Sequence, residues 1–205
     1  MRQLFSFLVM LGLMSLPLFS NAQNFEIGPK YPAPGDELTI KYNPEGTDLE
    51  GMKFETTAYL MTADGPHAVE VLMTETETGF EGKVMTSEAA NAVFFGFQNA
   101  DKRKRDDRDG KGYKTLLYKN EKPVKGVYLS KGNAYGNDYR TLGVKRDFDK
   151  ALKCYKKELK NTPEMAHDNT FMGRFVYWSS RQKNEEGLAQ CEKIAAEIAE
   201  KKDKT

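Results

Sequence analysis

The chain has 205 residues, with 31 Lys and Arg against 30 Asp and Glu, two His and two Cys. It contains no Cys-x-x-Cys and no His or Cys pair at metal-ligand spacing, which excludes a thioredoxin-type redox motif and argues against a zinc site. The near-neutral total hides an asymmetry: residues 23–100 hold 13 acids and four bases, and residues 101–205 hold 17 acids and 26 bases. Such asymmetry predicts either two modules that attract each other or a basic half that docks onto an anionic partner.

The first 22 residues have the pattern of a secretory signal peptide. Arg2 precedes an apolar run over residues 4–19, and the small residues of Ser20–Ala22 form a cleavage site. A membrane-spanning helix needs about 20 apolar residues, and this run is shorter. We therefore expect cleavage after Ala22 and an exported protein, periplasmic or secreted, with no membrane span once the signal is removed.

Residues 23–120 show the period-two pattern of β-strands separated by turn formers such as Pro34–Asp36 and Asp64–Pro66. The expected strands lie at Asn24–Ile27, Leu38–Tyr42, Ala58–Leu60, Val69–Met73, Phe80–Val84, Ala92–Phe97 and Tyr113–Tyr118. Seven short strands over roughly 95 residues predict an Ig-like antiparallel β-sandwich. The term describes architecture only, because the Cys…Trp…Cys pattern of antibody domains is absent.

From residue 126 onward the apolar period changes to that of α-helices. We expect helices at residues 127–142, 148–161, 165–180 and 184–202, with Asp147 as the N-cap of the second. Short connections between them predict antiparallel helical hairpins. The predicted class is therefore α+β and multidomain: a signal peptide (1–22), an Ig-like β-sandwich (23–120) and a TPR-like helical segment (126–205). An exported compartment permits a disulfide between Cys154 and Cys191, although spacing alone does not show one.

The densest charge cluster spans residues 101–113. Four aspartates flank Lys102–Arg105 and cancel most of its field, and an exported protein is separated from nucleic acids, so we expect no nucleic-acid partner. A calcium-binding EF loop is excluded because, with Gly110 at its sixth position, Arg105 and Leu116 stand where ligands are required. An Asp-Gly pair and a further glycine favour a polar hairpin loop between two strands.

The sequence carries no recognisable catalytic site. It lacks the Gly-x-Ser-x-Gly elbow, the phosphate-binding P-loop and the Gly-x-Gly-x-x-Gly fingerprint. Its two histidines, His67 and His167, lie in different halves of the chain. We therefore expect a protein that is not an enzyme and needs neither cofactor nor metal.

Three stretches carry a family resemblance: FEIGPKYPAPGDELTIKYNPEGTDLEG, AVFFGFQNADKR with DGKGYKTLLY, and RDFDKALKCYKKELKNTPE. With them, the mature chain resembles the N-terminal region of exported TlpA-like, thioredoxin-family disulfide reductases of Gram-negative bacteria. The resemblance implies an Ig-like domain and a helical segment that precede a thioredoxin domain. The sequence ends at Thr205, where that domain and its Cys-x-x-Cys would begin, so the resemblance implies no redox activity for these residues. The expected partner is another protein or a missing C-terminal domain of the same protein.

The third stretch also resembles the second helix of a tetratricopeptide repeat. Ala151, Tyr155 and Pro163 match the small, aromatic and proline positions of that helix, whereas Glu158 stands where a second small residue is usual. The resemblance covers about one repeat.

A weaker similarity links the loop to starch-binding sandwich modules, through Asp107, Asp109, Gly110, Lys111 and Tyr113. Those modules hold sugars against exposed aromatic faces, which here would come from Tyr42, Tyr59 or Tyr113. The leading expectation is a non-catalytic interaction module, and the alternative is a carbohydrate-binding module. The loop residues expected to contact a ligand or partner are Asp106, Asp107, Asp109, Gly110 and Tyr113.

Overall fold

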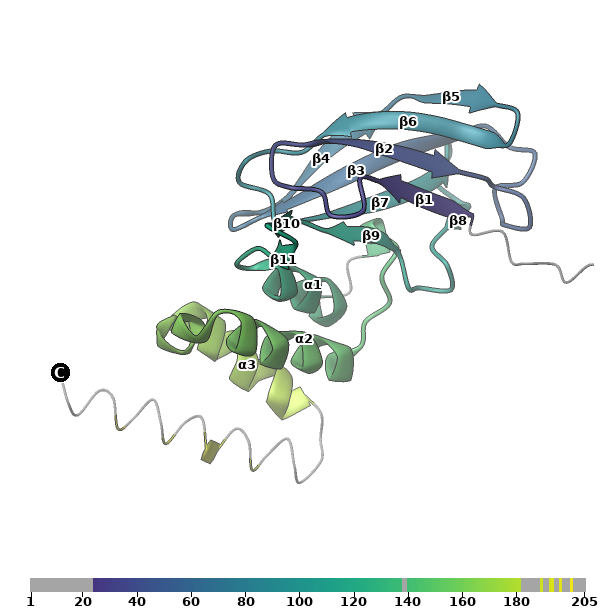
Figure 1. The fold of residues 1–205 in the computed structure, drawn as a ribbon. Coiled ribbons are helices and arrows are strands. Elements are labelled where there is room, and N and C mark those ends of the chain that lie inside the picture. Colours follow the sequence, from purple (N-terminus) through teal and green to yellow (C-terminus); the bar gives the residue numbers. More distant parts are fainter. Residues whose placement is uncertain are drawn as a thin grey trace, which may run out of the picture.

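The computed structural model describes residues 24–137 and 140–181, together with residues 189, 192, 193, 196 and 200. The described chain is a mixed α+β fold, with two antiparallel β-sheets arranged as a sandwich and three α-helices beside it (Figure 1). The predicted signal peptide, Cys191 and most of the predicted helix over residues 184–202 lie outside the described residues.

Both sheets are antiparallel throughout. The first has the order β1 (Phe25–Gly28), β2 (Glu37–Tyr42), β6 (Gly79–Met85) and β5 (Met73–Thr76). The second has the order β4 (Gly65–Val71), β3 (Phe54–Thr62), β7 (Ala92–Asn99) and β8 (Arg105–Asp106), and β9 (Tyr113–Leu116) also pairs with β7. A small hairpin of β10 (Tyr118–Lys119) and β11 (Lys122–Pro123) follows.

Strand β2 shows why the alternating pattern predicted these strands. Leu38, Ile40 and Tyr42 are buried between the two sheets, whereas Glu37 and Lys41 point outward. The ring of Tyr42 stacks on that of Phe97 in the opposite sheet, with centroids 3.9 Å apart. The core of the sandwich is therefore formed by the period-two apolar residues.

The predicted strand Val69–Met73 is wrong as a single strand. Strand β4 ends at Val71 in the second sheet, β5 begins at Met73 in the first sheet, and Leu72 between them is 80% exposed. Val71 and Met73 both pack against the same core. The apolar alternation therefore continues through the point where the chain crosses between sheets, and it gives no sign of the crossing.

The helices are α1 (Val127–Gly136), α2 (Phe148–Asn161) and α3 (Asn169–Arg181), with 3₁₀ turns at Arg140–Leu142 and Pro163–His167. The prediction for α2 is confirmed, and the Asp147 carboxylate accepts a hydrogen bond from the Lys150 N–H at 2.8 Å. Helix α1 is shorter than predicted. It ends at Gly136, where the indole ring of Trp178 from α3 packs against the glycine.

Strand β7 has both faces buried. Val93, Phe95 and Phe97 belong to the core between the sheets, whereas Ala92 and Phe94 belong to a second core that they share with the helices. Among the described residues, no ion pair joins an acid of segment 24–100 to a base of segment 101–181. The sandwich and the helices are thus held together by apolar packing rather than by their opposite charges.

Candidate functional site

The loop over residues 101–113 connects β7 to β9 as the predicted hairpin, with Phe95 paired to Tyr113. Its second half is tightly folded: Arg108, Asp109 and Gly110 all have positive φ, and the Gly110 N–H donates to the Asp107 carboxylate at 2.8 Å. The loop also docks on the segment before α2, because the Lys145 N–H donates to the Gly110 carbonyl at 2.9 Å. All four residues 101–104 in its first half are exposed, and its second half also exposes Arg108, Asp109 and Lys111.

Asp106 anchors this loop to the sandwich. Its Oδ2 accepts hydrogen bonds from the hydroxyls of Tyr42, at 2.9 Å, and Tyr113, at 2.6 Å. Both tyrosines are almost fully buried. Burial, followed by the hydrogen bond and the charge of Asp106, raises the pKa of Tyr113 above its ordinary value, and burial with the Asp106 charge does the same for Tyr42. Asp106 and Tyr113, two of the predicted ligand residues, therefore hold the loop in place.

Because of this arrangement, we expect the protein to lose stability at alkaline pH. In the unfolded chain Tyr42 and Tyr113 ionise near pH 10, and in the folded protein their pKa values lie higher. Their contribution to stability is full below about pH 10 and is lost as the pH rises further. We expect ultraviolet titration of tyrosinate to show these two phenols ionising only as circular dichroism reports unfolding. Complete ionisation of all ten tyrosines with native dichroism would contradict the assignment.

Two hollows flank the loop. One, of about 650 Å³, is lined by polar residues that include Asp48, Asp106 and Asp109. The other, of about 740 Å³, is lined by three of the predicted residues, Asp107, Asp109 and Gly110, together with the basic residues Arg105, Arg140, Lys145 and Arg146. Among the described residues, no three His, Cys, Asp or Glu side chains gather closely enough to hold a metal ion. Both hollows are lined by acids of the loop together with Lys and Arg side chains.

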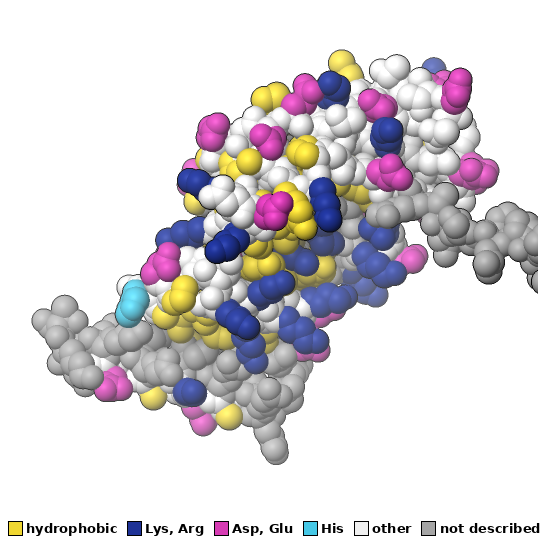
Figure 2. All heavy atoms as spheres, in the orientation of Figure 1, with side chains coloured by type: hydrophobic (Ala, Val, Ile, Leu, Met, Phe, Trp, Pro, Cys, Tyr) yellow, Lys and Arg dark blue, Asp and Glu magenta, His cyan; other side chains and the backbone are white. Residues whose placement is uncertain are grey.

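A cationic surface lies where the sandwich meets the helices, and Figure 2 shows Lys and Arg side chains gathered there. We call it the basic face and define it as Arg108, Lys114, Lys131, Lys150 and Lys157. The ring of Tyr135 contacts two of its ammonium groups, with Lys114 Nζ 5.7 Å and Lys150 Nζ 5.6 Å from the ring centroid. Among the described residues, Lys150 alone of this set forms an ion pair, with Asp147 at 3.0 Å.

Lys114 is the most perturbed cation of the basic face. Its Nζ donates to the Lys111 carbonyl and lies 5.9 Å from the ring centroid of Phe94. Burial, followed by the charges of Lys131 and Arg108, lowers the pKa of Lys114 to about 8. Positive charge is therefore crowded here beyond what the neighbouring acids neutralise.

The aromatic residues proposed for sugar binding do not form an exposed row. Tyr42 and Tyr113 are buried between the sheets, and Tyr59 packs against the core shared with the helices. The carbohydrate-binding alternative therefore loses the stacking platform that it required. Cys154 is buried, and burial raises the pKa of its thiol, so the thiolate that reacts is disfavoured. Its proposed disulfide partner lies outside the described residues.

A third hollow, of about 890 Å³, lies at the junction of the sandwich and the helices. Glu88 and Asn91 line it from the loop before β7, Lys125 from the chain before α1, and Asp168 and Arg174 from α3 and its start. No motif in the sequence marks any of these residues. The one available signal was Asn91, a polar residue directly before the apolar run that forms β7.

No family model, curated protein or solved structure matches the chain. Over its described part, no helix has both the length and the apolar content needed to cross a membrane. The charges, contacts and hollows of the chain are therefore the observations from which its function is inferred.

Proposed function

We propose that the protein is an exported, non-catalytic interaction module that binds an acidic partner protein through the basic face. The observation that carries this proposal is the placement of Lys114 and Lys150 on the ring of Tyr135 with Lys131 near Lys114, and with Asp147 as the only described carboxylate in an ion pair with the set. Uncompensated cations are costly to hold together, and an anionic surface placed on them relieves that cost.

The aromatic rings under these cations support a protein partner. Lys157 lies 4.4 Å from the ring centroid of Tyr128, in addition to the two lysines at Tyr135. These contacts place the ammonium groups of two helix lysines and of Lys114 on β9 against aromatic rings, which limits the side-chain freedom lost on binding. A rigid, charged and partly aromatic surface is typical of protein interfaces.

The finer family assignment is part of the same proposal. We propose that the sandwich is Ig-like, that α2 derives from a TPR-like hairpin, and that the whole corresponds to the region preceding the thioredoxin domain in TlpA-like reductases. The partner would then be a thioredoxin-family domain, on the same chain or on another. Whether the reading frame continues past Thr205 into a Cys-x-x-Cys domain tests this directly.

Neutralising the basic face is expected to weaken partner binding strongly. We predict that the Lys131→Gln, Lys150→Gln and Lys157→Gln triple variant binds the partner at least tenfold more weakly, about 1.4 kcal/mol. Because Lys114 loses its proton near pH 8, affinity should also fall between pH 7 and pH 9. The measurement is capture of periplasmic proteins by the immobilised mature protein, followed by titration of the captured protein.

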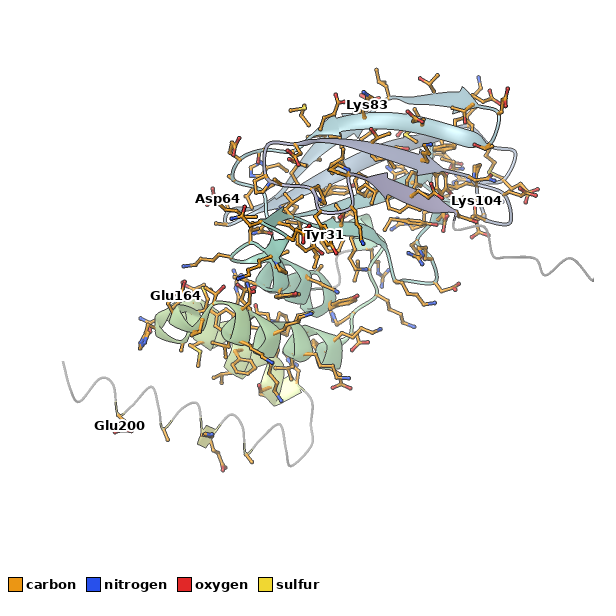
Figure 3. All side chains as sticks on the ribbon, viewed as in Figure 1. Tyr31, Asp64, Lys83, Lys104, Glu164 and Glu200 are labelled. Atoms are coloured by element: carbon orange, nitrogen blue, oxygen red, sulfur yellow. The ribbon has the colours of Figure 1, made fainter. Side chains whose placement is uncertain are left out.

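The matched control removes three charges elsewhere. Lys102, Arg103 and Lys104 are exposed on the loop at one end of the sandwich, and Figure 3 shows Lys104 there, far from Asp64 at the other end. The Lys102→Gln, Arg103→Gln and Lys104→Gln triple variant should keep its affinity for the partner within about twofold of the wild type, because salt screens exposed charges outside the binding surface. Equal losses in both variants would show a dependence on net charge alone. Capture of glycans with no protein would reverse the assignment in favour of the carbohydrate-binding alternative.

A further inference from the structure

The junction hollow is a second place where this chain can hold a ligand. Its volume of about 890 Å³ is within the range of pockets that hold small molecules, and it lies between two structural layers, where such pockets are common. Its wall combines apolar side chains such as Leu129 and Phe171 with charged side chains of both signs. The basic face contributes no side chain to it.

Asn91 marks the hollow as more than a packing defect. The residue is 8% exposed, and its Oδ1 is buried with no hydrogen-bond partner among the described residues. Its backbone is fully paired, because its N–H donates to the Met61 carbonyl at 2.8 Å and its carbonyl accepts from the Leu117 N–H at 2.9 Å. Among the described residues the fold therefore leaves the Asn91 Oδ1 unpaired, and a buried unpaired carbonyl oxygen lowers stability unless something binds it.

Gly126 leaves room for this amide. It has a φ of +83°, and a side-chain carbon added to it would lie 3.2 Å from Asn91 Nδ2. A glycine at this position lets the amide lie directly against the backbone that enters α1.

The groups around Asn91 select the chemical class of the ligand. A carboxamide offers a donor and an acceptor side by side, which is the complement of a peptide unit. Glu88 and Asp168 supply negative charge, and Lys125 and Arg174 supply positive charge. A neutral sugar can hydrogen-bond these groups but cannot neutralise their charges, whereas a short peptide with an amino and a carboxylate group can pair both signs.

We propose that the junction hollow binds a short zwitterionic peptide whose backbone amide pairs with Asn91, with its carboxylate toward Arg174. The inference goes beyond the proposed function, because the ligand is a free peptide that binds at a surface separate from the basic face.

The test is a titration of the mature wild-type protein, followed by the side-chain amide resonances of Asn91 in nitrogen–proton correlation spectra. Trialanine is the probe, and acetyl-alanyl-alaninamide has the same peptide unit without charged ends. We expect saturable shifts of the Asn91 resonances with trialanine and at least fivefold weaker binding of the capped peptide. Maltose and acetate should leave the resonances unmoved. Shifts with maltose instead, or no shift with either peptide, would overturn the proposal.

Two variants localise the effect. Asn91→Leu keeps the size of the side chain and the backbone hydrogen bonds, so we expect it to fold with an unchanged or higher Tm and to bind trialanine at least tenfold more weakly. Arg174→Gln should weaken trialanine to the level of the capped peptide. Unaltered trialanine affinity in a folded Asn91→Leu protein would exclude this site. The basic-face triple variant should bind trialanine normally, which separates failure of this inference from failure of the proposed function.

Discussion

Replacing Glu158 by alanine is expected to lower the free energy of unfolding by about 3 kcal/mol or more. Helix α1 has no side-chain cap of its own, and Gly126 stands at its N-cap position. The fully buried Glu158 carboxylate, which comes from α2, accepts hydrogen bonds from the N–H groups of Gly126 at 2.8 Å, Tyr128 at 2.9 Å and Leu129 at 3.2 Å. Without it, three donors at the positive end of a helix lose their partner.

Urea unfolding followed by circular dichroism measures this effect. Glu158→Gln keeps the shape but loses the charge and turns an amide N–H₂ toward N–H donors, so it should recover only part of the loss. The control is Glu164→Ala, which removes an exposed acid paired with Lys125 at 3.7 Å and should change stability by less than about 0.5 kcal/mol. Figure 3 shows Glu164 at the edge of the helical layer. A similar small change for both residues would refute the capping role of Glu158.

The second large effect is expected at Gly132, where alanine should lower stability by about 2 kcal/mol. In an ordinary helix the same substitution raises stability by about 1 kcal/mol, because glycine is a poor helix former. Here the added methyl group would lie 2.7 Å from the ring of Tyr155, which is fully buried between the helices. The ring cannot move aside without disturbing its stack with Phe171, whose centroid is 4.9 Å away.

Gly173 is the matched control for this reversal of sign. It lies inside α3, and a methyl group added to it meets no atom of the described residues within 4 Å. Gly173→Ala should therefore follow helix propensity and raise the Tm, whereas Gly132→Ala should lower it. Differential scanning calorimetry of the two variants gives the comparison. A higher Tm for both would show that α1 and α2 can move apart at no cost.

The sequence predicts those parts of this fold that depend on local periodicity. The alternation of Leu38, Ile40 and Tyr42 and the cap at Asp147 are written in neighbouring residues, so β2 and the start of α2 follow from them. Strand β8 has two residues, too few for a period. Gly132 and Gly136 look like helix weaknesses in isolation, and only the rings that pack on them explain their presence.

The candidate sites depend on contacts between distant residues, and this is why the sequence predicts them poorly. In the sequence Asp106 has the position of a solvated loop acid, but the hydroxyl of Tyr42, 64 positions away, donates a hydrogen bond to it. Glu158 departs from the tetratricopeptide pattern because its carboxylate accepts hydrogen bonds from the first N–H groups of α1, about 30 residues earlier in the chain. The excess of bases after residue 100 was visible from the start, but its concentration around Tyr135 required the packing of β9 against α1 and α2.

Strand β7 gives the molecule its cooperativity. Because Phe94 faces the helices and Phe95 faces the opposite sheet, one backbone segment is a wall of both hydrophobic cores. Loss of the helices would uncover Ala92 and Phe94 along with Met61, a strip of sheet that is now dry. Removing the helices would therefore expose part of the sandwich sheet, so we expect the two layers to unfold together.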